Sequence, residues 1–305
     1  MDFFVQQVVN GLTLGSVYAI IALGYTLVYG VLKLLNFAHG DVYMVGAFIG
    51  YGVLAAFGGP SALTVPVPIV LALMFVTAGL GSGFLGVAIE RFAYRPLRDA
   101  PRIAPLITAL GVSFFLQNSV LLLFSAQVRT YNSGAFIPTT TGIDVGPLDI
   151  SLVRILVIAA TVVLMVTLTL LVSRTRLGKA MRAVAHDREA AEMMGVDVNR
   201  TIVATFFIGS ALAGMAGVMV GLVFSRVFHL MGFVAGLKGF TAAVVGGIGN
   251  VPGAMLGGLL IGLAESFSSA YLSSTFQNLI VFAILIVVML VRPNGLLGRA
   301  DIQKV

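Results

Sequence analysis

The sequence predicts an all-α, polytopic membrane protein with about eight transmembrane helices and one shorter Gly-rich helix. Of its 305 residues, 59% are apolar and only 10% are charged, whereas soluble domains carry about 25% charged residues. A soluble enzyme, a disordered chain and a nucleic-acid-binding protein all need more polar surface than this composition provides. The apolar residues also gather in runs of about 20, the length that crosses a hydrocarbon core as a helix.

The apolar runs place the spans along the chain. We expect membrane-spanning helices at about 7–31, 40–58, 64–90, 103–124, 151–172, 201–225, 251–271 and 275–291. The piece at 234–248 is short for a crossing and rich in glycine, so we expect a broken or re-entrant helix there. The whole chain, 1–305, is predicted to form one transmembrane domain. The first span lacks a preceding basic segment and runs on into a second span, so we expect it to be retained rather than cleaved.

Lysine and arginine in the loops predict the orientation, because these residues favour the cytoplasmic side. The segments 91–102 and 173–200 and the C-terminal tail are rich in them, whereas the long loop 125–150 carries only Arg129. We therefore expect the basic segments and the C-terminus in the cytoplasm, and the N-terminus on the periplasmic side. This orientation requires the piece at 234–248 to carry the chain across the membrane.

Small residues recur every three or four positions on the first and sixth spans. The two stripes are Gly11, Gly15, Ala19 and Ala22, and Gly209, Ala213, Gly217 and Gly221. Such stripes let helix backbones approach closely. We expect tight packing there, and a sliding contact between moving helices is the alternative.

The segment 173–200 is too polar to enter lipid and too regularly patterned to be a linker. An apolar stripe at helical spacing is formed by Leu177, Met181, Val184 and Ala185. Asp197 is a suitable N-cap for the span that follows. We therefore expect a folded cytoplasmic loop that is anchored to the bundle.

Within this loop, the sequence predicts a short helix at about 188–194. Asp187 is a good N-cap, Glu189 suits the first turn, and Gly195 suits a left-handed C-terminal stop. Its expected apolar surface consists of Ala190, Ala191, Met193 and Met194. Such a helix fits a groove in a cytoplasmic partner, and a helix lying on lipid headgroups is the alternative.

Polar and ionisable groups at membrane depth are costly and mark candidate functional positions. The candidates for a translocation path are Asn36, His39, Asp41, Asn118, Lys238 and Glu265. Asp41 is expected either to cap the second span, with His39 bonded to a carbonyl, or to form part of a gate. Glu265 is expected either to pair with a neighbouring helix, with Lys238 as a candidate partner, or to line a pore.

Several motifs are missing from the sequence. There is no G-x-x-x-x-G-K-[ST] loop for ATP, no H-E-x-x-H metal motif and no cysteine. We therefore predict no catalytic residue, no metal site and no cofactor in this chain, which argues against an intramembrane enzyme. An ion-gradient-driven secondary transporter and a passive channel are the rival transport functions, since Asp41 and Glu265 leave an ion site open.

Glu189-Ala190-Ala191, followed after three residues by Gly195, resembles the EAA…G signature of ABC importer permeases. The proline that usually continues the signature is absent, which points to importers of hydrophobic amino acids. Segments resembling the permease of branched-chain amino acid ABC importers, in particular its H-type subunit, are 10–30, 36–47, 90–98, 240–258 and 292–298. Gly-bearing polar turns before small-residue spans, at 36–50 and 248–262, also suggest an inverted repeat of the kind found in transporters.

The resemblance implies that the helix at 188–194 is the coupling helix that docks into an ATPase subunit. The coupling residues it implies are Arg182, Asp187, Glu189, Ala190, Ala191, Met194 and Gly195. It further implies a second, paralogous permease, two cytoplasmic ATP-binding subunits and a periplasmic amino-acid-binding protein. The expected location is the bacterial inner membrane, with lipid and not nucleic acid around the chain, and the expected substrates are leucine, isoleucine and valine.

Overall fold

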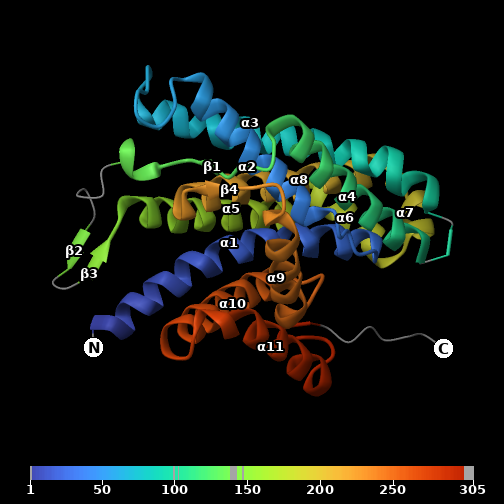
Figure 1. Ribbon diagram of the computed structural model, residues 1–305. Helices are drawn as coiled ribbons and strands as arrows, with labels where there is room; N and C mark the ends of the chain where they lie inside the picture. Colours follow the sequence, from blue (N-terminus) through green and yellow to red (C-terminus); the bar gives the residue numbers. More distant parts are fainter. Residues whose placement is uncertain (1, 99, 102, 138–142, 146–147, 299–305) are drawn as a thin grey trace.

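The computed structural model describes residues 2–98, 100–101, 103–137, 143–145 and 148–298, and these form a helical bundle (Figure 1). The first helices are α1 (Asp2–Leu32), α2 (His39–Ala56), α3 (Val67–Ile89), α4 (Ile103–Phe124), α5 (Leu152–Arg174) and α6 (Arg176–His186). They are followed by α7 (Arg188–Met193), α8 (Val198–Phe224), α9 (Met231–Gly246), α10 (Val251–Tyr271) and α11 (Gln277–Val291). A π-helical turn, Glu90–Tyr94, and a 3-10 turn, Arg95–Leu97, extend α3.

The described residues confirm the predicted all-α, polytopic membrane fold. Within them, seven helices are long and apolar enough to cross a membrane. Four α-helices lie outside this set: α2 begins with the polar His39 and Asp41, α9 has only 16 residues, and α6 and α7 are shorter still. The number of eight spans and the inverted repeat stay predictions.

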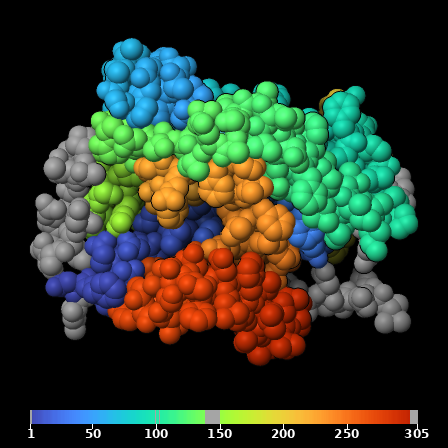
Figure 2. Space-filling model, in the orientation of Figure 1, coloured from blue at the N-terminus to red at the C-terminus, as the bar shows by residue number. Residues whose placement is uncertain are grey.

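The helix α1 forms the centre of the bundle. Its residues from Gly15 to Val28 are all buried, and Figure 2 shows the middle of α1 (dark blue) recessed between orange and red segments. A Cβ added at Gly15 would meet the backbone of Leu259 at 2.8 Å, and one at Gly11 would meet Leu263 at the same distance. The predicted small-residue stripe is therefore confirmed as a close contact between α1 and α10.

The second small-residue stripe serves α8 in the same way. Gly217 lies against Tyr43 and Ala47 of α2, and Gly209 lies near Gly24 of α1.

Bulkier apolar side chains point outward from the peripheral helices. Large exposed ones include Phe114, Phe115, Leu122, Val163, Leu170, Ile286 and Leu290. The small residues thus hold the centre together while the large ones form the outer apolar surface.

Short strands join segments near one end of the bundle. β1 (Arg129–Thr130) pairs with β4 (Arg226–Val227), and β2 (Ile143–Val145) pairs with β3 (Leu148–Ile150), both antiparallel. Beside β1, Tyr131 is fully buried and donates a hydrogen bond to the Ala47 carbonyl at 2.6 Å. Burial raises the pKa of the Tyr131 phenol well above its usual value, so the hydroxyl keeps its proton.

The helix α9 lies across the bundle rather than along it (Figure 1). It begins near Gly40 of α2, and it ends where Leu296 donates to the Val245 carbonyl at 2.9 Å. Of the two alternatives predicted for 234–248, the helix is unbroken up to Gly246, where it ends, and a re-entrant course stays a prediction. The non-helical stretch lies before α9, at 225–230, where β4 is already paired with β1.

Candidate translocation path and coupling surface

A buried ion pair joins three helices in the middle of the bundle. Lys238 of α9 donates to Glu265 of α10 at 2.6 Å, and Tyr18 of α1 donates to the other carboxylate oxygen at 2.9 Å. All three residues are less than a tenth exposed. The predicted pairing of Lys238 with Glu265 is confirmed. Each carboxylate oxygen has a donor, which a charge at this depth requires.

Asp41 lies in the first turn of α2, but its side chain bonds to α4. It accepts hydrogen bonds from the Ser113 hydroxyl and from the Gln117 amide, the latter at 3.0 Å. The expectation that Asp41 caps the second span is wrong, because α2 begins at His39 and its N-cap position is Ala38. The carboxylate therefore ties α2 to α4 instead of closing its own helix.

Asn36 and His39 have separate environments despite their closeness in sequence. The Asn36 side-chain oxygen accepts from the Ala38 amide and the Tyr94 hydroxyl, both at 3.1 Å. The His39 ring is fully buried, lies 4.6 Å from the Tyr25 ring and contacts Gly24. The Ile21 carbonyl lies close enough to act on the ring, but no hydrogen bond of standard geometry joins the ring nitrogens to the described residues, so the expected bond to a carbonyl stays a prediction.

Asn118 does not belong with these buried groups. Its side chain is exposed on α4 and donates to the Phe114 carbonyl of the same helix at 2.7 Å. Asn118 therefore does not face the interior of the bundle, and its place on the translocation path stays a prediction. The preceding residue, Gln117, points inward to Asp41. Successive residues of a helix differ in direction by about 100°, and the sequence did not show which of the two faces the core.

The polar segment after α5 folds as two short helices, α6 and α7, and α7 has the predicted ends. Asp187 accepts from the Ala190 amide at 3.0 Å, and Asp197 accepts from the Arg200 amide at 2.9 Å. Gly195 has a φ of +81°, the left-handed conformation that favours glycine. The predicted short helix, its N-cap and its stop are confirmed, with α7 ending at Met193.

The exposed surface of α7 differs in one residue from the prediction. Met193 and Met194 are 88% and 84% exposed, whereas Ala191 is only 5% exposed. The expectation that Ala191 lies on the exposed apolar surface is wrong, because the chain turns back and the Val196 amide bonds to the Ala191 carbonyl. Arg182 donates to the Val172 carbonyl at the end of α5, which fixes α6 to the bundle.

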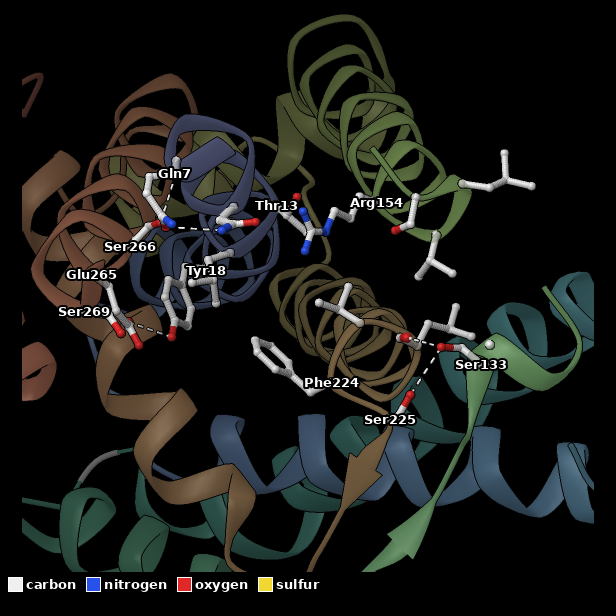
Figure 3. Close-up of a pocket in the computed structure, with 18 of the residues that line it drawn as sticks. Gln7, Thr13, Tyr18, Ser133, Arg154, Phe224, Ser225, Glu265, Ser266 and Ser269 are labelled. Atoms are coloured by element: carbon white, nitrogen blue, oxygen red, sulfur yellow. Dashed lines mark hydrogen bonds between the residues drawn. The ribbon is translucent and has the colours of Figure 1, made fainter. Parts of the chain in front are cut away.

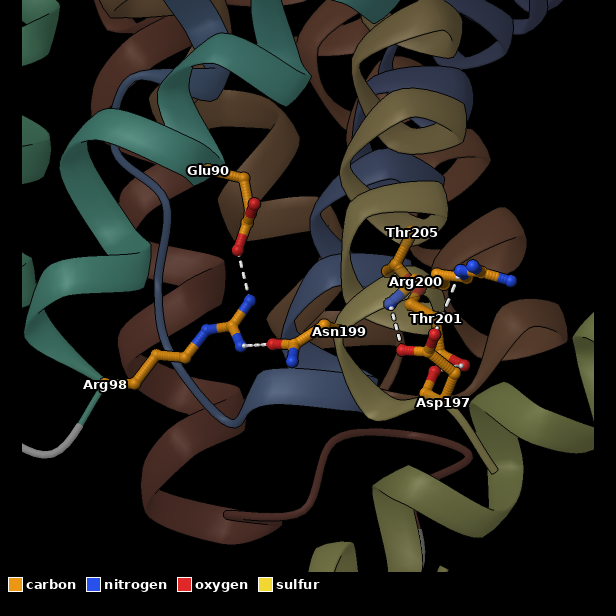
Figure 4. Close-up of polar contacts among 7 residues, drawn as sticks. All are labelled: Glu90, Arg98, Asp197, Asn199, Arg200, Thr201 and Thr205. Atoms are coloured by element: carbon orange, nitrogen blue, oxygen red, sulfur yellow. Dashed lines mark hydrogen bonds and ion pairs between the residues drawn. The ribbon is translucent and has the colours of Figure 1, made fainter. Parts of the chain in front are cut away.

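A second ion pair lies at the end of α3, and a hydrogen bond from its arginine reaches the start of α8 (Figure 4). Arg98 pairs with the fully buried Glu90 and donates to the Asn199 side chain at 2.5 Å. Asn199 lies in the first turn of α8, next to the Asp197 cap. From the sequence, the region around 91–102 was predicted as a basic cytoplasmic segment and as a stretch that resembles the permease family, but the Glu90–Arg98 pair was not predicted. A carboxylate at the end of a span, directly before several arginines, was the signal available.

Two large cavities open on the bundle along α1. The Arg154 cavity has a volume of about 700 Å³ and is lined by α1, α5, α8 and α10, with Tyr18 and Glu265 among its residues (Figure 3). The Lys33 cavity has a volume of about 880 Å³ and includes Tyr29, Lys33 and Arg182. Between them, the middle of α1 is buried. Packed helices therefore separate the Arg154 cavity from the Lys33 cavity, and a smaller cavity of about 440 Å³ lies beside Lys33 on the same side as the Lys33 cavity.

Comparison with known proteins assigns the chain to a family. A family model described as the branched-chain amino acid transport system permease component matches residues 7–289. The chain belongs to this permease family. It is 44% identical to the high-affinity branched-chain amino acid transport system permease protein BraD of Pseudomonas aeruginosa, over 99% of this chain and 98% of that protein. It is 42% identical to the corresponding protein LivH of Escherichia coli strain K12, over the same shares. No solved structure matches the chain.

Membership of the permease family confirms the resemblance inferred from the sequence motifs. It also favours the ABC importer over an ion-gradient-driven transporter, because the relatives are permeases of that importer class. The match runs from α1 into α11. The buried ion pairs, both cavities and the α6–α7 segment of this permease all have their principal residues within the matched range.

Proposed function

We propose that this chain is the membrane-spanning subunit of an ABC importer for leucine, isoleucine, valine or related hydrophobic amino acids. The main support is its sequence similarity, over nearly its full length, to BraD and LivH, which are named as branched-chain amino acid permeases. The proposed partners are a paralogous permease, two cytoplasmic ATP-binding subunits and a periplasmic amino-acid-binding protein. ATP hydrolysis takes place in the ATP-binding subunits, and the assembly lies in the bacterial inner membrane.

In this proposal α7 is the coupling helix. Met193 and Met194 are almost fully exposed and adaptable in shape, which suits a groove on an ATP-binding subunit. Asp187 and Gly195 fix the two ends of the segment, and Ala191 holds it against the bundle. Closure of the ATP-binding subunits therefore moves α7 as a unit and passes that motion to α6 and α8.

Transport in this proposal follows alternating access. The two cavities are the outer and inner ends of the path, and the packed middle of α1 is the closed part between them. Movement of α8 and α10 against α1 opens one end while the other closes. Glu265, which lines the Arg154 cavity and pairs with Lys238, lies at the boundary of the closed part.

Reconstitution tests the function. The complete complex in proteoliposomes should take up leucine with ATP and without an ion gradient. Glu189→Lys and Gly195→Pro should abolish this uptake, because a reversed charge and a blocked left-handed turn disrupt the α7 segment. His186→Gln, which changes an exposed residue of the same loop, is the matched control and should import normally. Normal uptake by both α7 variants contradicts the coupling role, and uptake driven by an ion gradient alone contradicts the importer.

A further inference from the structure

The Arg154 cavity has a size and lining suited to a small amphiphilic ligand. Its volume of about 700 Å³ lies within the range of about 300–1,000 Å³ typical of ligand pockets. Its apolar lining residues include Leu14, Ile137, Val153, Leu222 and Val223. The remaining lining includes hydroxyl and amide side chains of α1, α8 and α10, so the cavity offers both an aliphatic surface and hydrogen-bonding groups.

The charges in this cavity are not balanced among its described residues. Glu265 already has Lys238 and Tyr18 as partners, so its negative charge is compensated. Arg154 is the one cationic side chain among the described lining residues. Its Nη1 atom is buried and has no hydrogen-bond partner within the part of the chain that the structure describes. A ligand with an anionic group would therefore find a donor in this cavity.

The position of Arg154 in its helix supports the same conclusion. It lies in the first turn of α5, where the helix dipole disfavours a cation. The N-cap residue Ser151 also lines the cavity and makes no side-chain capping bond. In Figure 3 the Arg154 guanidinium extends from α5 toward Thr13 of α1. Helix stability does not explain an arginine here, whereas binding of a carboxylate does.

We propose that the Arg154 cavity is a substrate-binding site of the permease itself, which takes a zwitterionic aliphatic amino acid. Arg154 binds the carboxylate, and the apolar lining residues of α1, α5 and α8 receive the side chain. Hydroxyl and amide oxygens of the lining accept from the ammonium group. This inference rests on the proposed function and adds that the membrane subunit selects its cargo by the carboxylate.

Protection of an introduced thiol tests the site. The chain has no cysteine, so Ser225→Cys places a single thiol on the cavity wall. The complete complex, with cysteine-free partner subunits and without binding protein or ATP, is treated with a membrane-impermeant thiol reagent. We expect L-leucine to slow labelling, and leucinol, which lacks the carboxylate, not to slow it.

Variants of Arg154 then identify the binding group. Arg154→Gln should raise the leucine concentration for half-protection by about ten- to hundredfold, the range of a lost charged hydrogen bond, and Arg154→Lys should give a smaller rise. Arg226→Gln, an exposed arginine on β4 outside the cavity lining, is the matched control and should change nothing. Co-purification of the ATP-binding subunits checks assembly, and Arg154→Lys carries the test if Arg154→Gln does not assemble.

The outcomes separate this inference from the proposed function. Equal protection by leucine and leucinol overturns the carboxylate site. So does labelling that depends on anionic lipid and not on leucine, because Arg154 is then a lipid contact. Absence of protection in a complex that still imports leucine with ATP overturns the site and leaves the proposed function standing. A correctly assembled complex that imports no amino acid overturns the proposed function itself.

Discussion

At the scale of single residues, the most demanding feature is the Lys238–Glu265 pair. Charges at membrane depth are stable only when each finds a partner, and here Tyr18 donates to the second carboxylate oxygen. The three groups come from α9, α10 and α1. Their geometry therefore depends on the correct packing of three helices, and the pair reports on that packing.

Removal of one partner should destabilise the permease more than removal of both. Glu265→Gln leaves the Lys238 ammonium without its counter-ion, and breaking a buried pair in this way costs about 3–5 kcal/mol. The double variant Lys238→Met/Glu265→Gln should recover much of the loss. Thermal unfolding of the purified complex measures this, with Lys33→Met, an exposed lysine, as the control. A single variant that unfolds at the wild-type temperature would contradict a tightly coupled pair.

The sequence predicted this pair but not the bonds of Asp41. Few charges lie at membrane depth, so Lys238 was a natural partner for Glu265. Asp41 had many uncharged candidates, and its partners Ser113 and Gln117 lie more than 70 positions away along the chain. The direction of the Asn118 side chain was not predictable for a related reason. Most of α4 is apolar, so no periodic pattern in its sequence marks the face that points into the bundle.

At the scale of helices, the contact from Arg98 to Asn199 braces α8 just beyond the coupling segment. Glu90 and Arg98 belong to the end of α3, whereas Asn199 lies in the first turn of α8. Only a few residues separate the end of α7 from Asn199, so a displacement of α7 would also move Asn199. The contact is therefore placed to transmit a displacement of α7 to α3.

Loss of this contact should uncouple transport from ATP hydrolysis. Asn199→Ala keeps the Glu90–Arg98 pair and removes only the link to α8, so assembly should be unchanged. We expect fewer leucine molecules imported per ATP hydrolysed, measured in proteoliposomes. Asn278→Ala, an asparagine exposed on α11, is the matched control and should leave the ratio unchanged. An unchanged ratio in Asn199→Ala, or a lowered one in Asn278→Ala, would refute this role.

Helix positions were predictable where a local signal marks them. Hydrophobic length predicts the long spans, and the caps Asp187, Gly195 and Asp197 predict the ends of the short cytoplasmic helices. The transverse course of α9 was not predictable. It depends on the contact of its start with Gly40 and of its end with residues 296–298, both distant in sequence.

At the scale of the whole molecule, the positions of the loops suit the proposed orientation. The α6–α7 segment with its arginines lies at one end of the bundle in Figure 1, and the strands β2 and β3 lie at the other. Arginine and lysine favour the cytoplasmic side. The proposal therefore places α7 in the cytoplasm and the turn between α10 and α11 on the outer side.

Labelling of single cysteines in the cysteine-free chain measures the orientation directly. Met194→Cys and Ser274→Cys change exposed residues in α7's C-terminal turn and in the turn between α10 and α11. With a membrane-impermeant reagent, Met194→Cys should react only in inside-out vesicles and Ser274→Cys only in right-side-out vesicles. The reversed pattern would invert the topology, and reaction of both from one side would contradict the course of the chain through α8 to α10.

The burial of α1 has a consequence for biogenesis. In the finished protein α1 is enclosed by α8, α9 and α10, which are translated more than 160 residues after it. Until those helices arrive, a span that contains Thr13, Ser16 and Tyr18 must stay in lipid or be shielded by an insertion factor. The native packing of α1 is therefore completed only after translation has passed residue 271, and chains truncated before α10 are expected substrates for membrane quality control.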